Sequence, residues 1–106
     1  MDALLVITNL PDAESARALA VTLIEQRVAA CVNILSPCHS IFRWEGKLDE
    51  AEEVPLLIKT SAARYAALEE AIRAYHPYEL PEIIAVRIEK GLPGYLAWLA
   101  KETSAQ

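Results

Sequence analysis

Two histidines and two cysteines are the residues of this sequence best suited to bind a transition metal. His76 is the strongest single candidate, because imidazole suits copper and zinc and because a helical pattern ends here, before Pro77. An imidazole at the end of a helix exposes its ring and its backbone together. The alternative is a structural histidine whose ring only forms hydrogen bonds within the fold.

Cys38 and His39 form the second candidate, a soft ligand beside a borderline one. Neighbouring strand residues point to opposite faces, so both reach one ion only if the backbone bends after Pro37. Cys31 precedes an apolar strand, so we expect an inert core thiol there. We expect no disulfide, because an extended segment after Cys31 places the two Cα atoms beyond the roughly 7 Å that a disulfide tolerates.

Acidic side chains gather just before an apolar segment, as Asp49, Glu50, Glu52 and Glu53. This run either attracts cations or forms a solvated stretch that keeps its surroundings soluble. Over the whole chain of 106 residues, 15 acidic and 10 basic residues give a formal net charge of −5. We therefore expect no general nucleic-acid binding, which requires a basic surface to displace counterions from phosphates.

The length and composition fit one globular domain over residues 1–106. The N-terminus lacks the basic and apolar regions of a signal peptide, and no apolar run approaches the roughly 20 residues of a membrane span. We therefore expect a cytoplasmic protein with no membrane partner. The sequence contains no phosphate-binding glycine loop, nucleophile elbow, zinc quartet or Cys-x-x-Cys motif, so we do not expect an enzyme.

The elements that must position these residues follow from apolar spacing and from capping and turn residues. Alternating or continuous apolar runs predict strands, and apolar residues at helical spacing predict helices. The first expected elements are a strand over 3–8, a helix capped by Asp12 and ending near 27 or 28, and a strand segment over 31–44 interrupted at Pro37. A tight turn at Glu45-Gly46, a strand over 54–60 and a helix capped by Ser61 should follow. The last elements are a strand over 82–88 and a short helix with Pro93 in its first turn.

This β-α-β-β-α-β-α order predicts an α+β fold, a ferredoxin-like βαββαβ sandwich with an extra C-terminal helix and a long hairpin over residues 32–60. The helices should cover one face of a four-stranded antiparallel sheet. The hairpin carries more apolar side chains than a solvated ribbon tolerates, and an exposed apolar edge favours pairing with another chain. An isolated hairpin is also only marginally stable. We expect it to pack against neighbouring subunits in a closed ring; the alternative is that it folds onto its own sheet.

Several ordered segments resemble the CutA family, the divalent-cation-tolerance proteins. The matching segments are residues 16–20, 25–34, 40–47, 57–60, the string His76-Pro77-Tyr78-Glu79-Leu80-Pro81 with residues 82–84, Gly91 and residues 95–99. The resemblance implies a tight homotrimer, a role in tolerance of divalent metals with copper binding, and no established catalytic reaction. It also implies a copper site, whose expected ligand positions correspond here to Thr8, Tyr75 and His76, so that only His76 is a ligating residue.

A further set of residues lies in these family-like segments at loops or strand ends, namely Trp44, Glu45, Lys59, Tyr78, Glu79 and Glu82. If subunits meet there, these side chains could line a cleft with an aromatic wall, carboxylates and one ammonium group, suited to a small polar ligand or a metal complex. The alternative is that they seal the subunit interface. Two functions remain open: a homotrimeric metal-tolerance protein, and a PII-like signalling module that binds a small ligand and contacts an unidentified protein partner.

Overall fold

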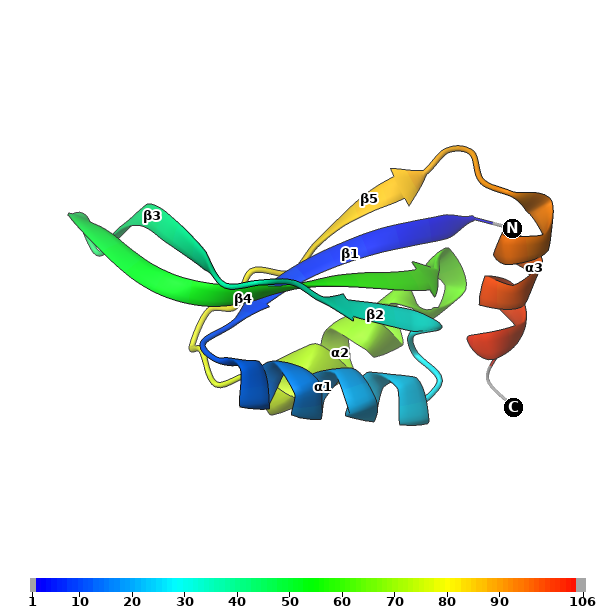
Figure 1. Ribbon diagram of the computed structural model, residues 1–106, viewed down its shortest axis with the longest axis horizontal. Coiled ribbons are helices and arrows are strands. Elements are labelled where there is room, and N and C mark those ends of the chain that lie inside the picture. Colours follow the sequence, from blue (N-terminus) through cyan, green and yellow to red (C-terminus); the bar gives the residue numbers. More distant parts are fainter. Residues whose placement is uncertain (1, 105–106) are drawn as a thin grey trace.

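The structure, a computed structural model, describes residues 2–104 and contains an antiparallel sheet with two helices on one side and the C-terminal helix at one end (Figure 1). In chain order the elements are β1 (Ala3–Leu10), α1 (Ala13–Glu25), β2 (Cys31–Ile34), β3 (Cys38–Trp44), β4 (Lys47–Ser61), η1 (Ala62–Arg64), α2 (Tyr65–Tyr75), β5 (Ile84–Ile88) and α3 (Pro93–Glu102). The sheet order is β2-β4-β1-β5, with β3 pairing β4. The predicted α+β ferredoxin-like fold with a C-terminal helix and a long hairpin is confirmed.

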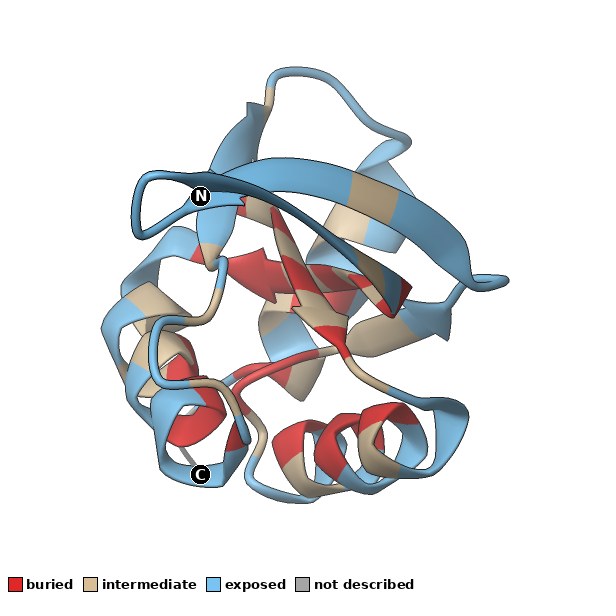
Figure 2. Ribbon diagram, turned by 90° about the vertical axis from the view of Figure 1, so that its left-hand side faces the viewer, coloured by how far each residue is buried: buried red, intermediate tan, exposed pale blue. Residues whose placement is uncertain are grey.

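The hydrophobic core lies between the sheet and the helices α1 and α2, as the buried residues in Figure 2 show. Its side chains come from alternate positions of β1 and β4 and from the inward faces of both helices, including Val6, Leu10, Leu23, Leu56, Ile58, Leu68 and Ile72. Asp12 caps α1 as predicted, since its Oδ1 accepts from the backbone N–H of Ser15 at 2.7 Å.

Strand β4 runs without interruption from the sheet into a projecting hairpin, in which residues 38–44 pair with residues 47–53. We call this hairpin, residues 38–53, the arm. Its turn has positive φ angles at Glu45 (49°) and Gly46 (80°), which matches the right-handed twist of the strands. Pro55 lies inside β4, and its carbonyl oxygen accepts from the N–H of Leu35, in the gap between β2 and β3. The nitrogen of Pro55 faces the same gap, so the N–H that proline lacks is not needed for strand pairing.

Two expected details are wrong. Ser61 makes no capping bond to the following helix, which is preceded by the short 3₁₀ turn η1. Its hydroxyl instead accepts a bond from Thr103 at 3.1 Å, because the end of α3 packs over this point. The last strand begins at Ile84 rather than at residue 82, where the side chain of Glu82 is bonded to Asn9 instead.

The chain direction changes sharply after α2, as predicted from the prolines. His76 adopts extended backbone angles of −75° and 133° immediately before Pro77 and ends the helix. The segment from residue 76 to residue 83 then runs past the base of the arm to β5 (Figure 1). Among residues 2–104, none of the helices is long and apolar enough to cross a bilayer.

Candidate functional site

A cleft opens where the arm leaves the sheet. It has a volume of about 350 Å³, and its aromatic wall consists of Phe42, Trp44 and Tyr78. The carboxylates of Asp49, Glu53 and Glu79 complete it, together with Ala51 and Leu80. A second hollow of about 470 Å³ shares Phe42, Trp44, Glu53, Tyr78 and Leu80 with the first and extends to Asn9 and Glu82. We call the two together the arm-base cleft.

The half of this cleft formed by β3 and β4 follows from the alternation of side chains along each strand and from the register between the strands. Phe42 and Trp44 are two positions apart on β3 and therefore point to the same side of the arm. Phe42 lies opposite Asp49, and Cys38 lies opposite Glu53, so Asp49 and Glu53 share that side on β4. The loop after α2 supplies the other half.

His76 anchors that loop. Its side chain is buried, with 8% of its surface exposed, and its Nδ1 accepts from the backbone N–H of Tyr78 at 3.1 Å. Nε2 therefore carries the proton and donates to the carbonyl oxygen of Asn9 at 2.6 Å. Burial lowers the pKa of His76, although the bond to Asn9 and the charge of Glu53 act in the opposite direction. The ring is thus a neutral tie between β1 and the loop.

Tyr78 is held by its side chain as well as by its backbone. Burial, followed by a hydrogen bond to Glu53 and the charges of Glu53 and Asp12, raises the pKa of Tyr78 to about 12. The phenol therefore stays protonated at neutral pH and donates to the Glu53 carboxylate, which is itself only 8% exposed. Its ring lies 4.7 Å from that of His76, tilted by 51°. Tyr78 is therefore held by its backbone, by Glu53 and by the ring of His76.

Four of the six residues expected to line a cleft do so within one chain: Trp44, Tyr78, Glu79 and Glu82. Glu45 lies at the turn of the arm, outside it. Lys59 lies further along β4, opposite Leu5 of β1 and Cys31 of β2, and its Nζ donates to Asn33 at 2.5 Å. The structure of one chain therefore leaves these two outside the arm-base cleft, and a shared cleft between subunits stays a prediction.

Cys38 and His39 are the first two residues of the regular strand β3, so the bend that would bring both side chains to one ion is not present at these positions. The side chain of His39 bonds Glu50 at 2.6 Å on one side of the arm. The sulfur of Cys38 lies 3.8 Å from the Ser40 hydroxyl on the other side. Both cysteines are free, and across residues 2–104 no group of three or more His, Cys, Asp and Glu side chains could hold a metal ion.

The remaining metal candidates have little room to ligate. Both nitrogens of His76 already form hydrogen bonds, so a metal there would have to displace Asn9 or Tyr78. Thr8 is fully buried, and its hydroxyl has no hydrogen-bond partner among the described residues, whereas Tyr75 is exposed. The metal roles of His76, His39 and Cys38 stay predictions. Cys31 is half-buried beside Tyr95 rather than in the core, contrary to expectation.

Sequence reasoning missed several members of the cleft. Phe42 follows from the same two-residue alternation that places Trp44, and that signal was present in the sequence. Glu53 was grouped with a solvated acidic run, because nothing local distinguishes it from Glu52. Its burial depends on Tyr78, a contact between residues 25 positions apart in the chain.

Comparison with known proteins identifies the family. Residues 4–102 match the family model described as CutA1 divalent ion tolerance protein. The divalent-cation tolerance protein CutA of Thermus thermophilus is 44% identical over 92% of this chain and 95% of its own length. Mouse Protein CutA is 41% identical over 90% of this chain, which spans about half (54%) of the mouse protein.

A solved structure points to the same family. The CutA structure from Archaeoglobus fulgidus, described as a periplasmic divalent cation tolerance protein, has a TM-score of 0.93 at 35% identity, covering 96% of this chain and 99% of that one. The match extends over the sheet, the helices and the arm together. The chain belongs to the CutA1 family of divalent ion tolerance proteins.

Proposed function

We propose that this chain works as a homotrimer that binds a divalent cation, with copper as the candidate, and that it catalyses no reaction. The observation that supports assembly is an apolar surface on the arm and on the sheet edge. Leu48 and Ile41 of the arm are 72% and 64% exposed, and Val86 of β5 is 54% exposed. Exposed apolar strands of this kind invite pairing with another chain, and closed rings satisfy them.

Light scattering at micromolar concentration tests the assembly with a matched pair of variants. Val86→Glu should convert the trimer to a smaller species, because it places a charge on the surface assigned to the interface. Val21→Glu makes the same change on α1, where Val21 is 42% exposed, and should leave the trimer intact. A wild-type monomer, or equal effects of both variants, would refute the proposed interface.

For copper, the geometry favours His39 over His76. The imidazole of His39 is exposed on the arm and touches one carboxylate, that of Glu50, whereas His76 would have to break bonds inside the fold. Imidazole and carboxylate together suit Cu(II). Calorimetric titration with Cu(II) should show weaker binding for His39→Gln than for the wild type. Cys38→Ser, on the opposite side of the arm, should bind as the wild type does, and unchanged binding by His39→Gln would refute this assignment.

The arm-base cleft favours a second candidate function, that of a small-ligand-binding module resembling the PII proteins in its use of a cleft. Three aromatic side chains and several carboxylates converge there, which is typical of a binding site. A thermal-shift panel of metabolites and metals distinguishes the two functions. Stabilisation by metabolites alone supports the second, and stabilisation by metals alone supports the first.

The same proposal includes a cytoplasmic location and an unidentified protein partner. It also includes the absence of catalysis, of nucleic-acid binding and of a membrane partner. Cys31, His39 and His76 lie on separate elements, which supports a non-catalytic role. The net charge of −5 disfavours nucleic acid. Fractionation of cells tests the location, for which the periplasmic description of the Archaeoglobus relative supplies the competing outcome.

A further inference from the structure

The charged side chains that line the arm-base cleft all have the same sign. Asp49, Glu53, Glu79 and Glu82 line its two hollows, and no lysine, arginine or histidine of the described chain lines either. Carboxylates on neighbouring walls of one concave site concentrate a negative potential within it. The cleft therefore favours a cation over a neutral or anionic ligand.

The same walls present aromatic rings to the cleft. Phe42 and Trp44 are 40% and 39% exposed, and Tyr78 is held in place by its bonds to His76 and Glu53. The face of an aromatic ring carries negative electrostatic potential and attracts a cation, most strongly for tryptophan. A ligand with both a positive charge and an apolar body gains from the rings and from the carboxylates together.

Glu53 supplies an independent reason to expect a positive charge here. Its side chain is nearly buried, and its hydrogen-bond donor, Tyr78, is neutral. Neither ion pair formed among residues 2–104 involves Glu53; these are His39 with Glu50 and Arg87 with Asp2. A buried carboxylate without a counter-charge is costly, and a cation in the cleft would offset that cost.

Metal ions fit this cleft poorly. No three potential ligands converge on one point within the described residues, and divalent ions retain water rather than contact aromatic rings. An alkylated ammonium ion has a lower hydration cost and a methyl surface that packs on rings. Its size also suits a hollow of about 350 Å³.

We propose that the arm-base cleft binds a small organic ammonium ion between Trp44 and Tyr78, with Glu53 and Glu79 as its counter-charges. This assignment rests on the second candidate function, small-ligand binding, and names its ligand class. Copper binding at His39 is independent of it.

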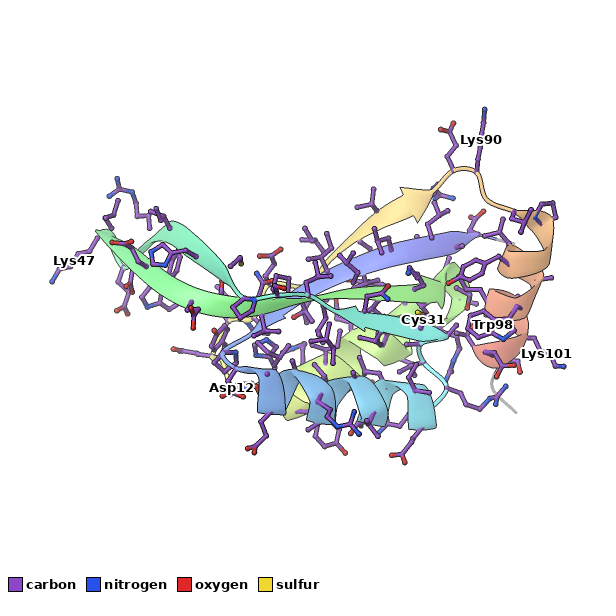
Figure 3. All side chains as sticks on the ribbon, viewed as in Figure 1. Asp12, Cys31, Lys47, Lys90, Trp98 and Lys101 are labelled. Carbon is purple, nitrogen blue, oxygen red and sulfur yellow. The ribbon has the colours of Figure 1, made fainter. Side chains whose placement is uncertain are left out.

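The test uses the assembled full-length protein and tetramethylammonium chloride as the probe. The chain has two tryptophans, and Trp98→Phe leaves Trp44 as the only one. Trp98 lies on α3, at the end of the molecule opposite Lys47 and the arm, so its replacement is remote from the cleft (Figure 3). The fluorescence of Trp44 should change saturably with the probe. Equal additions of sodium chloride control for ionic strength, and tert-butanol, a neutral molecule of similar shape, should bind at least about tenfold more weakly.

Matched variants test whether the ammonium ion binds in this cleft. Their binding is measured by calorimetry, because one of them lacks Trp44 and therefore its fluorescence. Trp44→Leu should weaken tetramethylammonium binding about tenfold. Glu79→Gln should weaken it about threefold, because an exposed charge is partly screened. Glu45→Gln removes the same charge at the turn of the arm and should leave binding unchanged. Glu79 is exposed and outside the core, so its variant remains informative if Trp44→Leu disturbs folding.

Three outcomes would overturn the proposal: no saturable binding by the wild-type assembly, equal binding of tert-butanol, or binding unaffected by both cleft variants. Calorimetry with Cu(II) on the same preparation shows whether copper binding is lost as well when the ammonium ion does not bind. Intact copper binding with no ammonium binding rejects only the cleft assignment. A metabolite that binds while tetramethylammonium does not leaves small-ligand binding intact and rejects the ammonium class.

Discussion

Strand β4 passes through two different surroundings. Residues 54–61 lie between β1 and β2 and bury Val54, Leu56 and Ile58 against the helices. Residues 47–53 pair only with β3, and Leu48 there is 72% exposed. The first region obtains its stability from core packing, whereas the second remains an extended ribbon with one neighbouring strand. The arm-base cleft lies where one region becomes the other, at Glu53.

The difference shows that one continuous strand can be part of the core at one end and remain exposed at the other, where we propose a binding surface. Beyond its base at Glu53, the arm is held mainly by the pairing of β3 with β4, so most of its side chains remain exposed. The loop after α2 completes the cleft only because His76 ties it to β1. The packed sheet and helices therefore hold the side chains of the arm-base cleft in position.

The largest expected effect comes from a matched pair of leucines on β4. Leu56→Ala should lower the free energy of unfolding by about 3 kcal/mol, because Leu56 is fully buried and leaves a cavity. Leu48→Ala should lower it by less than about 0.5 kcal/mol within one subunit, where Leu48 is 72% exposed, and any larger loss measures the burial of Leu48 between subunits. Urea unfolding at one fixed protein concentration measures both. An equal loss in the two variants would mean that the arm is packed as tightly as the sheet.

The next effect concerns the tie between the two regions. His76→Gln should cost about 2 kcal/mol at pH 7, since the bonds to Asn9 and Tyr78 are lost or weakened.

The pH dependence tests the same residue. Because the pKa of His76 is lowered in the folded state, the unfolded chain takes up its proton first, at about pH 6.5. Wild-type stability should fall as the pH drops below this value, and part of that slope should vanish in His76→Gln. His39→Gln, a change on the exposed arm, is the control, and an unchanged slope in His76→Gln would contradict the assignment.

A smaller effect is expected at Tyr78. Tyr78→Phe keeps the ring but removes the donor to Glu53, so stability at pH 7 should fall by about 1 kcal/mol. The folded pKa of about 12 lies above the ordinary 10, so this contribution is complete below pH 10 and declines between pH 10 and 12. Ultraviolet titration should lose its latest tyrosine step in the variant, whereas Tyr75→Phe, at an exposed site, should retain it.

The same contrast explains what the sequence could predict. The element order, the cap at Asp12, the place of Pro93 in the first turn of α3 and the turn at Glu45-Gly46 depend on neighbours in the chain, and the structure confirms them. The six residues expected to line a cleft between subunits share family-like segments at loops or strand ends. Trp44, Tyr78, Glu79 and Glu82 line the arm-base cleft of one chain, whereas Glu45 and Lys59 do not. The burial of Glu53 and the two bonds of His76 were not predictable, because they depend on how a distant loop meets the base of the arm.

Glu53→Gln should have little effect on stability, and it is the most direct test of the junction. Glutamine keeps an acceptor for Tyr78 but removes the buried charge, so the ligand-free protein should unfold within about 1 kcal/mol of the wild type, or be slightly more stable. Glu52→Gln, the exposed neighbour, is the matched control for net charge. A loss of more than about 3 kcal/mol in Glu53→Gln alone would mean that the charge is already compensated within the assembled protein. The cleft would then need no external cation.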